Sequence, residues 1–166
     1  MEHHTLLSFR IAERRLALPL DAVRYVAPVP LLESPVAAPY FVEGFFDFQG
    51  APVAAIRLDR LLGLGDVKPG LYTPLLILAD AKQAIALLVD KVDGIMKVAV
   101  SAIQPIGDDE TLNGCVVGRI SDRADTVYLM EASCLLLAAE RERFAALRVM
   151  QERRLEALSS DAVHAS

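Results

Sequence analysis

The chain has 166 residues, 54% of them hydrophobic, which is enough material for one or two small packed units. The net charge is −5 and no basic stripe occurs, so the composition argues against nucleic-acid binding. No apolar run reaches the roughly 18 residues that a membrane span needs, and the N-terminus lacks the basic-then-apolar order of a secretory signal. We therefore expect a cytoplasmic protein without direct membrane insertion.

Short extended segments fill the first part of the chain. Residues 5–11 predict a strand with Leu7, Phe9 and Ile11 on one face and Ser8 and Arg10 on the other. Residues 16–20 resume extended structure, and Pro19 places them near a sheet edge or a strand end. Asp21 is a candidate cap for one helical turn. Residues 25–32 contain two prolines and are expected to be extended and at most partly paired.

The stretch 42–64 predicts a strand, a turn, a second strand and a short helix. Its alternating side chains are Phe46, Asp47, Phe48 and Gln49. Gly50 supplies a backbone that accepts positive φ at the turn. The apolar run 53–56 suits a strand covered on both faces. Asp59 is expected to cap or open the helical turn, and Gly63 to end it.

A loop rich in glycine and proline, residues 65–74, is the first candidate boundary between two groups of strands. Two apolar strands follow at 75–79 and 84–89, and a short polar turn joins them into a hairpin. Residues 90–98 alternate again, with Gly94 as the expected bulge.

A further hairpin and a helix end the pattern. Residues 113–120 and 126–130 form the hairpin, and a helix begins within 131–139 that can run on to Leu158. Its apolar face consists of Phe144, Leu147, Leu155 and Leu158, interrupted by Gln151. This face either packs back on the strands or binds a partner or a second copy of the chain. Both interpretations stay open, because helical spacing alone does not identify what covers a face.

The count is nine or ten short strands with turn signals every ~8–12 residues, which is typical of an all-β sandwich or barrel. The strands fall into two groups, roughly before and after residues 65–74. Two small barrels of about five strands each would accommodate them without open edges.

The residues give little support for catalysis. No phosphate-binding loop or dinucleotide motif occurs. The histidines, His3, His4 and His164, lie at the chain ends, so we expect no metal site. Cys115 and Cys134 lie in apolar contexts and are expected to be buried thiols, with no interior histidine to act as a base.

The carboxylate groups Asp90/Asp93 and 108–110 are most simply turn-forming or solvated. Nothing in the sequence supports a disulfide. A binding module with no cofactor is therefore favoured over an enzyme.

Five segments occur in an order that matches a known family. They are Leu18-Pro19-Leu20-Asp21-Ala22-Val23, Val42-Glu43-Gly44-Phe45-Phe46-Asp47-Phe48-Gln49-Gly50, Val53-Ala54-Ala55-Ile56-Arg57-Leu58, Leu88-Val89-Asp90-Lys91-Val92-Asp93-Gly94-Ile95 and Ile103-Gln104-Pro105. This order resembles the CheW-like domain of bacterial chemotaxis adaptors. Each motif is degenerate alone, but the ordered set is specific and covers about residues 5–139.

The resemblance implies a mainly β fold of two packed five-stranded SH3-like barrels, with short helices and a C-terminal helix. Residues 1–139 would form the CheW-like domain, with the boundary between sub-barrels near 65–74 and the N-terminal strand able to cross between them. Residues 140–158 would be a helical extension, and residues 159–166 a disordered tail.

The resemblance also implies a non-catalytic scaffold that couples the cytoplasmic tip of a chemoreceptor to the regulatory domain of a CheA-type histidine kinase. The kinase contact of the family is barrel against barrel. The receptor contact lies in the groove between barrels. The matching residues here are Val23, Tyr25, Gly44, Phe46, Asp47, Gln49 and Gly50.

Several positions depart from the family pattern. Gln49 replaces the hairpin arginine, Tyr25 replaces a glutamate that can pair with it, and Asp47 replaces an asparagine. Replacing both halves of a charge pair can be nearly neutral for stability, but recognition built on that pair is in doubt. The family's Asp-Leu-Arg is inverted to Arg57-Leu58-Asp59.

Two other function classes are alternatives. The first is a small-ligand-binding or other protein-interaction module on the same scaffold, for example in pilus-based motility. A ligand would bind in the groove between the barrels, in a pocket on which several polar groups converge. The second is a hydrolase, which would need a clustered base and nucleophile that the sequence does not provide.

Overall fold

The computed structural model describes residues 2–34, 38–66, 68–79, 85–107, 114–135, 137, 153 and 155–158. Ten strands carry most of the regular structure of this described part. They are β1 (His3–Ile11), β2 (Arg14–Pro19), β3 (Val23–Pro28), β4 (Val42–Phe48), β5 (Ala51–Arg57), β6 (Pro74–Leu78), β7 (Ile85–Leu88), β8 (Lys91–Ala99), β9 (Val116–Asp122) and β10 (Asp125–Met130). The helical elements are α1 (Leu58–Leu61), the 3-10 turns η1 (Leu20–Ala22) and η2 (Val100–Ala102), and helical residues at 132–135, 137, 153 and 155–158.

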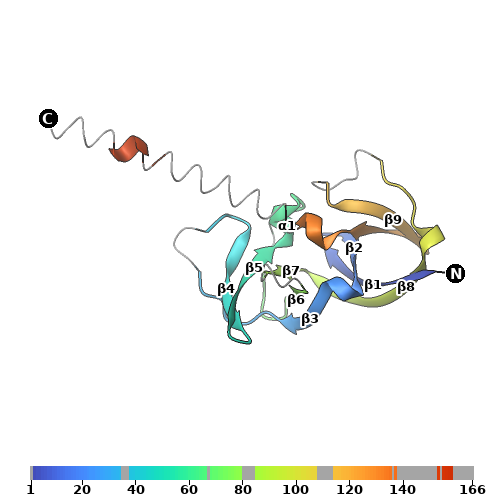
Figure 1. Ribbon diagram of the computed structural model, residues 1–166, viewed down its shortest axis with the longest axis horizontal. Coiled ribbons are helices and arrows are strands. Elements are labelled where there is room, and N and C mark those ends of the chain that lie inside the picture. Colours follow the sequence, from blue (N-terminus) through green and yellow to red (C-terminus); the bar gives the residue numbers. More distant parts are fainter. Residues whose placement is uncertain are drawn as a thin grey trace.

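The strands form two five-stranded sheets. The first sheet has the order β8-β1-β2-β10-β9, and the second has the order β3-β6-β7-β5-β4. They lie side by side, with the N-terminus at the outer end of the first sheet (Figure 1). The protein is therefore mainly β with two five-stranded sheets, as predicted.

Both sheets have the same connectivity. In each, a hairpin (β1–β2 or β6–β7) pairs on one side with an antiparallel edge strand (β8 or β3). On its other side it meets a parallel neighbour (β10 or β5), which pairs with the second edge strand (β9 or β4). The second sheet uses five consecutive strands, whereas the first uses β8–β10 and then β1–β2. The first sheet is thus a circular permutation of the second.

The two edges of each sheet approach each other. Glu33, which follows edge strand β3, forms an antiparallel bridge to Phe45 on the opposite edge strand β4. In the same way Gln104, which follows β8, forms a bridge to Arg119 on β9. Each bridge consists of two backbone hydrogen bonds of 2.8–2.9 Å. These bonds occupy edge groups that an open sheet would present to other chains.

Two glycines make this approach possible. A Cβ added at Gly44 would lie 2.8 Å from the Leu32 Cβ and 2.9 Å from the Glu33 carbonyl oxygen. A Cβ added at Gly118 would lie 2.6 Å from the Ile103 Cγ2. Gly44 and Gly118 occupy equivalent places in β4 and β9, and each lies next to the bridge that joins the two edges.

Buried side chains form three clusters. One lies between the two sheets, and each sheet curves around one of the other two. The cluster inside the first sheet comes from all five strands: Leu6, Ala17, Val98, Ile120, Val127 and Leu129. On β1, Leu7 and Phe9 belong instead to the cluster between the sheets. Both faces of β1 are therefore covered, and Ser8 is only 3% exposed. The predicted strand is confirmed, and its second face is buried as well because that face points into the first sheet.

Several local predictions are confirmed. Pro19 is the last residue of β2. Gly50 has a φ of 84° at the β4–β5 turn, and Gly63 has a φ of 67° just after α1. The register between β1 and β8 shifts opposite Gly94, which marks the predicted bulge.

The predicted cap at Asp21 is wrong, because the N-cap of η1 is Pro19 and Asp21 lies inside the turn. The N-cap of α1 is Arg57, and Asp59 lies in the first turn, as one of the two expected places for it. Its carboxylate accepts a hydrogen bond of 3.0 Å from the Arg60 backbone N–H and also pairs with the Arg57 guanidinium.

The loop at 65–74 does not coincide with a change of sheet. It joins β5 to β6, which both belong to the second sheet. The chain changes sheet at η1, between β2 and β3, and again between β7 and β8. The first sheet thus takes its strands from both ends of the strand-forming region, because the β1–β2 hairpin pairs with β8 and β10.

Candidate protein-binding surface

The β4–β5 turn presents one end of the candidate receptor site. Gln49 and Gly50 both have positive φ, 52° and 84°, and they connect two antiparallel strands. A two-residue turn with both φ values positive matches the twist of a hairpin. Glycine takes this conformation without strain, whereas Gln49 takes it at a cost. The turn therefore places Gln49 at the tip of the hairpin.

Strand β3 lies next to this turn, because β3 and β4 are the two edge strands of the second sheet and these edges approach each other. The Tyr25 ring packs edge-on against the Phe48 ring with 5.2 Å between centroids. The Arg24 Nη2 donates a hydrogen bond of 3.1 Å to the Gln49 Oε1. The Arg24 guanidinium also lies 5.7 Å from the centre of the Tyr25 ring. We call Arg24, Tyr25, Phe48 and Gln49 the edge seam.

The edge seam occupies the two positions where the family pattern has a glutamate and an arginine. Here an aromatic contact and a neutral amide join the same two strands. Tyr25 remains 45% exposed, and Arg24 and Gln49 are exposed. The seam therefore offers a partner the Tyr25 ring and the Arg24 guanidinium, but not the glutamate carboxylate of the family pattern.

The other predicted receptor-site residues are spread around the seam. Gly50 and Asp47 are exposed at the hairpin. Phe46 is half-buried against the cluster inside the second sheet, and Val23 against the cluster between the sheets. Gly44 is buried against Leu32 and Glu33, so its place in the fold is structural.

The predicted helix face is described only in part. Leu155 and Leu158 are helical and 64% and 65% exposed. Phe144 and Leu147 lie outside the described residues, as does the tail 159–166.

A buried ion pair lies behind the β4–β5 hairpin. Arg57 Nε and Nη2 donate to the two carboxylate oxygens of Asp59 at 2.9 and 2.7 Å, and both side chains are buried. Arg57 also contacts Glu43 at 3.4 Å and Asp66 at 3.1 Å. The Asp59 hydrogen bond raises the pKa of Arg57 above its ordinary value, although burial opposes this. The network joins β4, β5, α1 and the loop after α1.

The sequence showed these residues only as an inverted motif. Arg57 and Asp59 flank Leu58, which is fully buried in the cluster between the sheets. Their spacing of two residues around a core side chain was the available signal. The structure shows that the inverted motif closes on itself as an ion pair.

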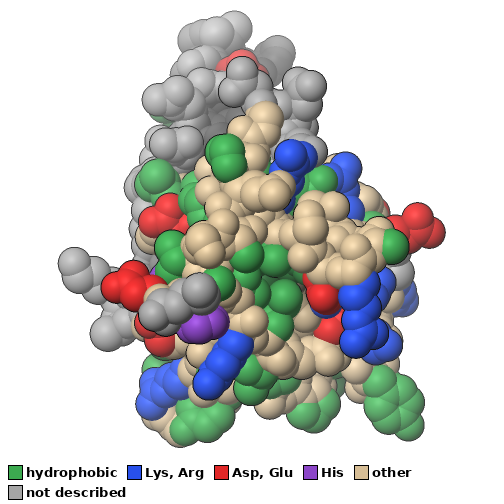
Figure 2. Space-filling view, turned by 90° about the vertical axis from the view of Figure 1, so that its right-hand side faces the viewer, with side chains coloured by type: hydrophobic (Ala, Val, Ile, Leu, Met, Phe, Trp, Pro, Cys, Tyr) green, Lys and Arg blue, Asp and Glu red, His purple; other side chains and the backbone are tan. Residues whose placement is uncertain are grey.

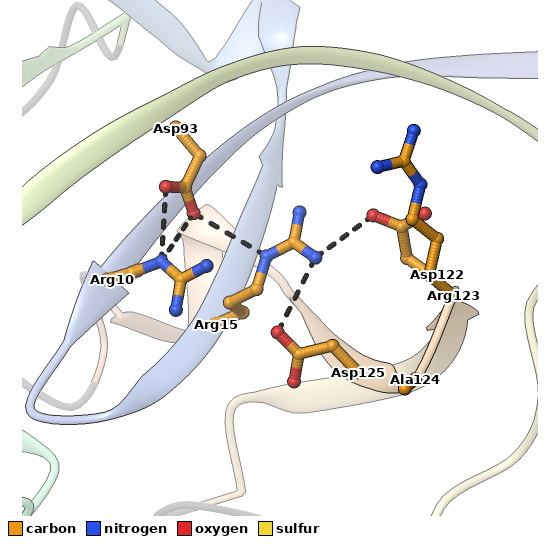
Figure 3. Close-up of a pocket in the computed structure, with 7 residues that line it drawn as sticks. All are labelled: Arg10, Arg15, Asp93, Asp122, Arg123, Ala124 and Asp125. Carbon is orange, nitrogen blue, oxygen red and sulfur yellow. Dashed lines mark hydrogen bonds and ion pairs between the residues drawn. The ribbon is translucent and has the colours of Figure 1, made fainter.

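A pocket of about 450 Å³ lies at the end of the first sheet where the β1–β2 and β9–β10 turns meet (Figure 3). Its charged side chains are Arg10, Arg15, Asp93, Asp122, Arg123 and Asp125. Arg15 lies 3.5 Å from Asp93, 3.0 Å from Asp122 and 3.6 Å from Asp125. Burial opposes the charge of Arg15, but these carboxylates raise its pKa above the ordinary value.

These charges are mostly engaged with one another. Arg10 donates to both oxygens of Asp93 at 3.1 Å (Figure 3). Asp90, nearby, accepts a hydrogen bond of 2.6 Å from the Ala12 backbone N–H and so holds the β1–β2 turn. Asp90 is thus turn-forming as predicted, whereas Asp93 is an ion-pair residue. The acidic group 108–110 lies outside the described residues.

Exposed apolar side chains also occur on the first sheet. Ile95 on β8 is 64% exposed, Val117 on β9 is 49% exposed and Val100 in η2 is 39% exposed. The view onto the first-sheet side of the molecule shows hydrophobic side chains gathered near its centre, with charged groups around them (Figure 2). This side is a second candidate surface for a protein partner.

The described residues were also compared with the requirements of a metal site and of a membrane-spanning helix. Among the described residues, no group of three or more His, Cys, Asp or Glu side chains could hold a metal ion. In the same part of the chain, no helix is long and apolar enough to cross a bilayer.

The fold and the surfaces define a β-rich protein of two curved sheets. The model of the CheW-like domain family matches residues 5–141, and the chain belongs to this family. This confirms the resemblance read from the sequence motifs.

Two known proteins illustrate the relationship. The chain is 28% identical over 142 residues to "Protein FrzA" of Myxococcus xanthus, covering 82% of this chain and 88% of that protein. It shares its fold with the scaffolding protein TtCheW of Thermoanaerobacter tengcongensis, with a TM-score of 0.74, 20% identity, and coverage of 81% of this chain and 92% of that one.

Proposed function

We propose that this protein is a non-catalytic, cytoplasmic adaptor in bacterial chemosensory signalling, which couples a chemoreceptor tip to a CheA-type histidine kinase. The observation that carries the proposal is the family match over residues 5–141, which covers β2 to β10 and all of β1 except its first two residues. The shared fold with a protein described as scaffolding gives further support. The role could equally serve a specialised array, such as one that controls pilus-based motility.

We assign the receptor contact to the edge seam. Tyr25 is a half-exposed aromatic side chain held in place by Phe48, and Arg24 adds a cation next to it. Aromatic and arginine side chains carry much of the binding energy at protein interfaces. A receptor that fits this seam would present an apolar surface and an acceptor for Arg24, rather than a group that reads a glutamate–arginine pair.

We assign the kinase contact to the exposed apolar side chains of the first sheet, of which Ile95 is the most exposed. This leaves the two partners on different sheets. An adaptor that holds both at once needs such a separation.

Titration calorimetry tests these assignments with a kinase regulatory domain and a receptor cytoplasmic fragment from the same genome. Tyr25→Ala should weaken receptor binding by about tenfold and leave kinase binding unchanged. Tyr72→Ala is the matched control, because Tyr72 is 89% exposed in a loop outside the seam. If the receptor binds Tyr25→Ala as tightly as the unmodified chain, the seam assignment is wrong. If neither partner binds the unmodified chain, the adaptor function is wrong.

The alternative is a small-ligand-binding module, whose ligand was expected in the groove between the barrels. The polar pocket of Figure 3 is lined instead by residues of the first sheet and its turns. A ligand there would have to displace ion pairs that already join Arg10 and Arg15 to Asp93, Asp122 and Asp125. The geometry therefore favours the adaptor.

A further inference from the structure

Two thiols meet beside the β9–β10 hairpin. Cys115 lies immediately before β9 and is fully buried, and Cys134 lies in the helical residues 132–135 that follow β10 and is partly exposed. Their Sγ atoms are 2.7 Å apart. The Cys134 thiol also lies 3.3 Å from the Gly114 carbonyl oxygen, to which it can donate.

The backbone holds both residues in place. Met130 and Val116 are the last pair of the β9–β10 ladder, so the two cysteine-bearing segments leave the same end of one hairpin. The Glu131 backbone N–H donates to the Cys115 carbonyl at 3.1 Å, and the Leu135 N–H donates to the Glu131 carbonyl at 3.2 Å. The thiols thus face each other from segments that hydrogen bonds tie together. A disulfide bond of about 2.05 Å needs only a small further approach of the two sulfurs.

We propose that Cys115 and Cys134 are a redox modification site, which low-molecular-weight disulfides such as glutathione disulfide oxidise to an intramolecular disulfide. Cys134 reacts first because solvent reaches it. Its thiolate attacks one sulfur of glutathione disulfide, forms a mixed disulfide and releases one glutathione thiolate. The Cys115 thiolate then attacks the Cys134 sulfur and displaces the second glutathione. Two protein thiols are oxidised and one glutathione disulfide is reduced to two thiols, because the two protons released by the cysteines are taken up through solvent by the two glutathione thiolates.

The new bond would fasten the first helical turn after β10 to the start of β9. Leu135 is fully buried in the cluster between the sheets, so this turn belongs to the core of the protein. Oxidation would therefore hold the helical residues 132–135 in place against the start of β9. This inference does not depend on the proposed adaptor function.

Intact-mass spectrometry of the full chain tests the proposal after incubation in glutathione redox buffers and alkylation of the remaining thiols. The unmodified chain should lose both alkylation sites and two hydrogens, without a retained adduct. Cys115→Ser should stop at one glutathione adduct on Cys134, and Cys134→Ser should react far more slowly because Cys115 is buried. Oxidation should also raise the Tm of the unmodified chain by about 5–10 °C, reversibly on reduction.

Three results would overturn the proposal. They are a stable single adduct on the unmodified chain, two thiols that stay alkylatable in oxidising buffer, and a disulfide that forms only between two chains.

Discussion

At the scale of single residues, the Arg57–Asp59 pair shows how a change in motif order is absorbed. Both side chains are buried, and they neutralise each other while Leu58 between them fills the core. A buried pair contributes little over a well-packed apolar pair, but breaking one half leaves a charge without its partner. Removing one side chain of the pair should therefore lower the stability more than replacing both.

Asp59→Ala should lower the free energy of unfolding by about 3 kcal/mol, because the buried Arg57 guanidinium loses its bidentate partner. Urea denaturation measures this value. Asp66→Ala is the matched control, since Asp66 contacts the same guanidinium from an exposed position, and its effect should be much smaller. Equal effects of the two substitutions would contradict the account of this pair.

Asp66 gives a prediction for pH dependence. Its hydrogen bond from Arg60 lowers its pKa below the ordinary value of 3.8. The ionised form is thus stabilised in the folded state, so the contribution is fully present above pH 3.8 and is lost as pH falls through the lowered pKa. Thermal unfolding of Asp66→Asn should show a lower Tm than the unmodified chain at pH 6, and the gap should narrow below pH 3.8. A gap independent of pH would contradict this reading.

At the scale of elements, two glycines allow each sheet to bring its edges together. The Cβ of an alanine at position 44 would meet a backbone oxygen and a Cβ, whereas at position 118 it would meet a side-chain methyl group. Backbone yields less readily than a side chain, so the two positions should differ in cost.

Gly44→Ala should lower the free energy of unfolding by about 2–3 kcal/mol, and Gly118→Ala by about 1–2 kcal/mol. Gly70→Ala is the control, because nothing lies within 4 Å of an added Cβ there. Chemical denaturation of the three variants gives the ranking. A tolerated Gly44→Ala would mean that the two edges do not approach as closely as described.

Sequence patterns predicted the features that depend on neighbours in the chain. Gly50 and Gly94 were identified because a turn and a bulge need their backbone freedom. Pairing between distant strands left no such local signal. The change of sheet at η1 is one example, since only the pairing of β1 and β2 with β8 and β10 reveals it.

The candidate site was predictable to a similar extent. The resemblance located Tyr25 and Gln49, and the structure brings both to the edge seam. It could not supply Arg24 or Phe48, because these are contacts between opposite edges of a sheet. Gly44 was included among the receptor-site residues, and its burial against Leu32 and Glu33 gives it a structural place.

At the scale of the whole molecule, two sheets of one connectivity share a core and leave different surfaces free. The edge seam lies on the second sheet, and the exposed apolar side chains Ile95, Val100 and Val117 belong to the first sheet and the turn after β8. An adaptor that joins two proteins would use such an arrangement, since neither partner then blocks the other.

Sedimentation velocity of the full chain, mixed with a kinase regulatory domain and a receptor cytoplasmic fragment of one genome, tests the central claim most directly. The account predicts a single ternary species that contains all three proteins, and Tyr25→Ala should release the receptor fragment while the kinase domain stays bound. A chain that sediments alone in the presence of both partners would contradict the account.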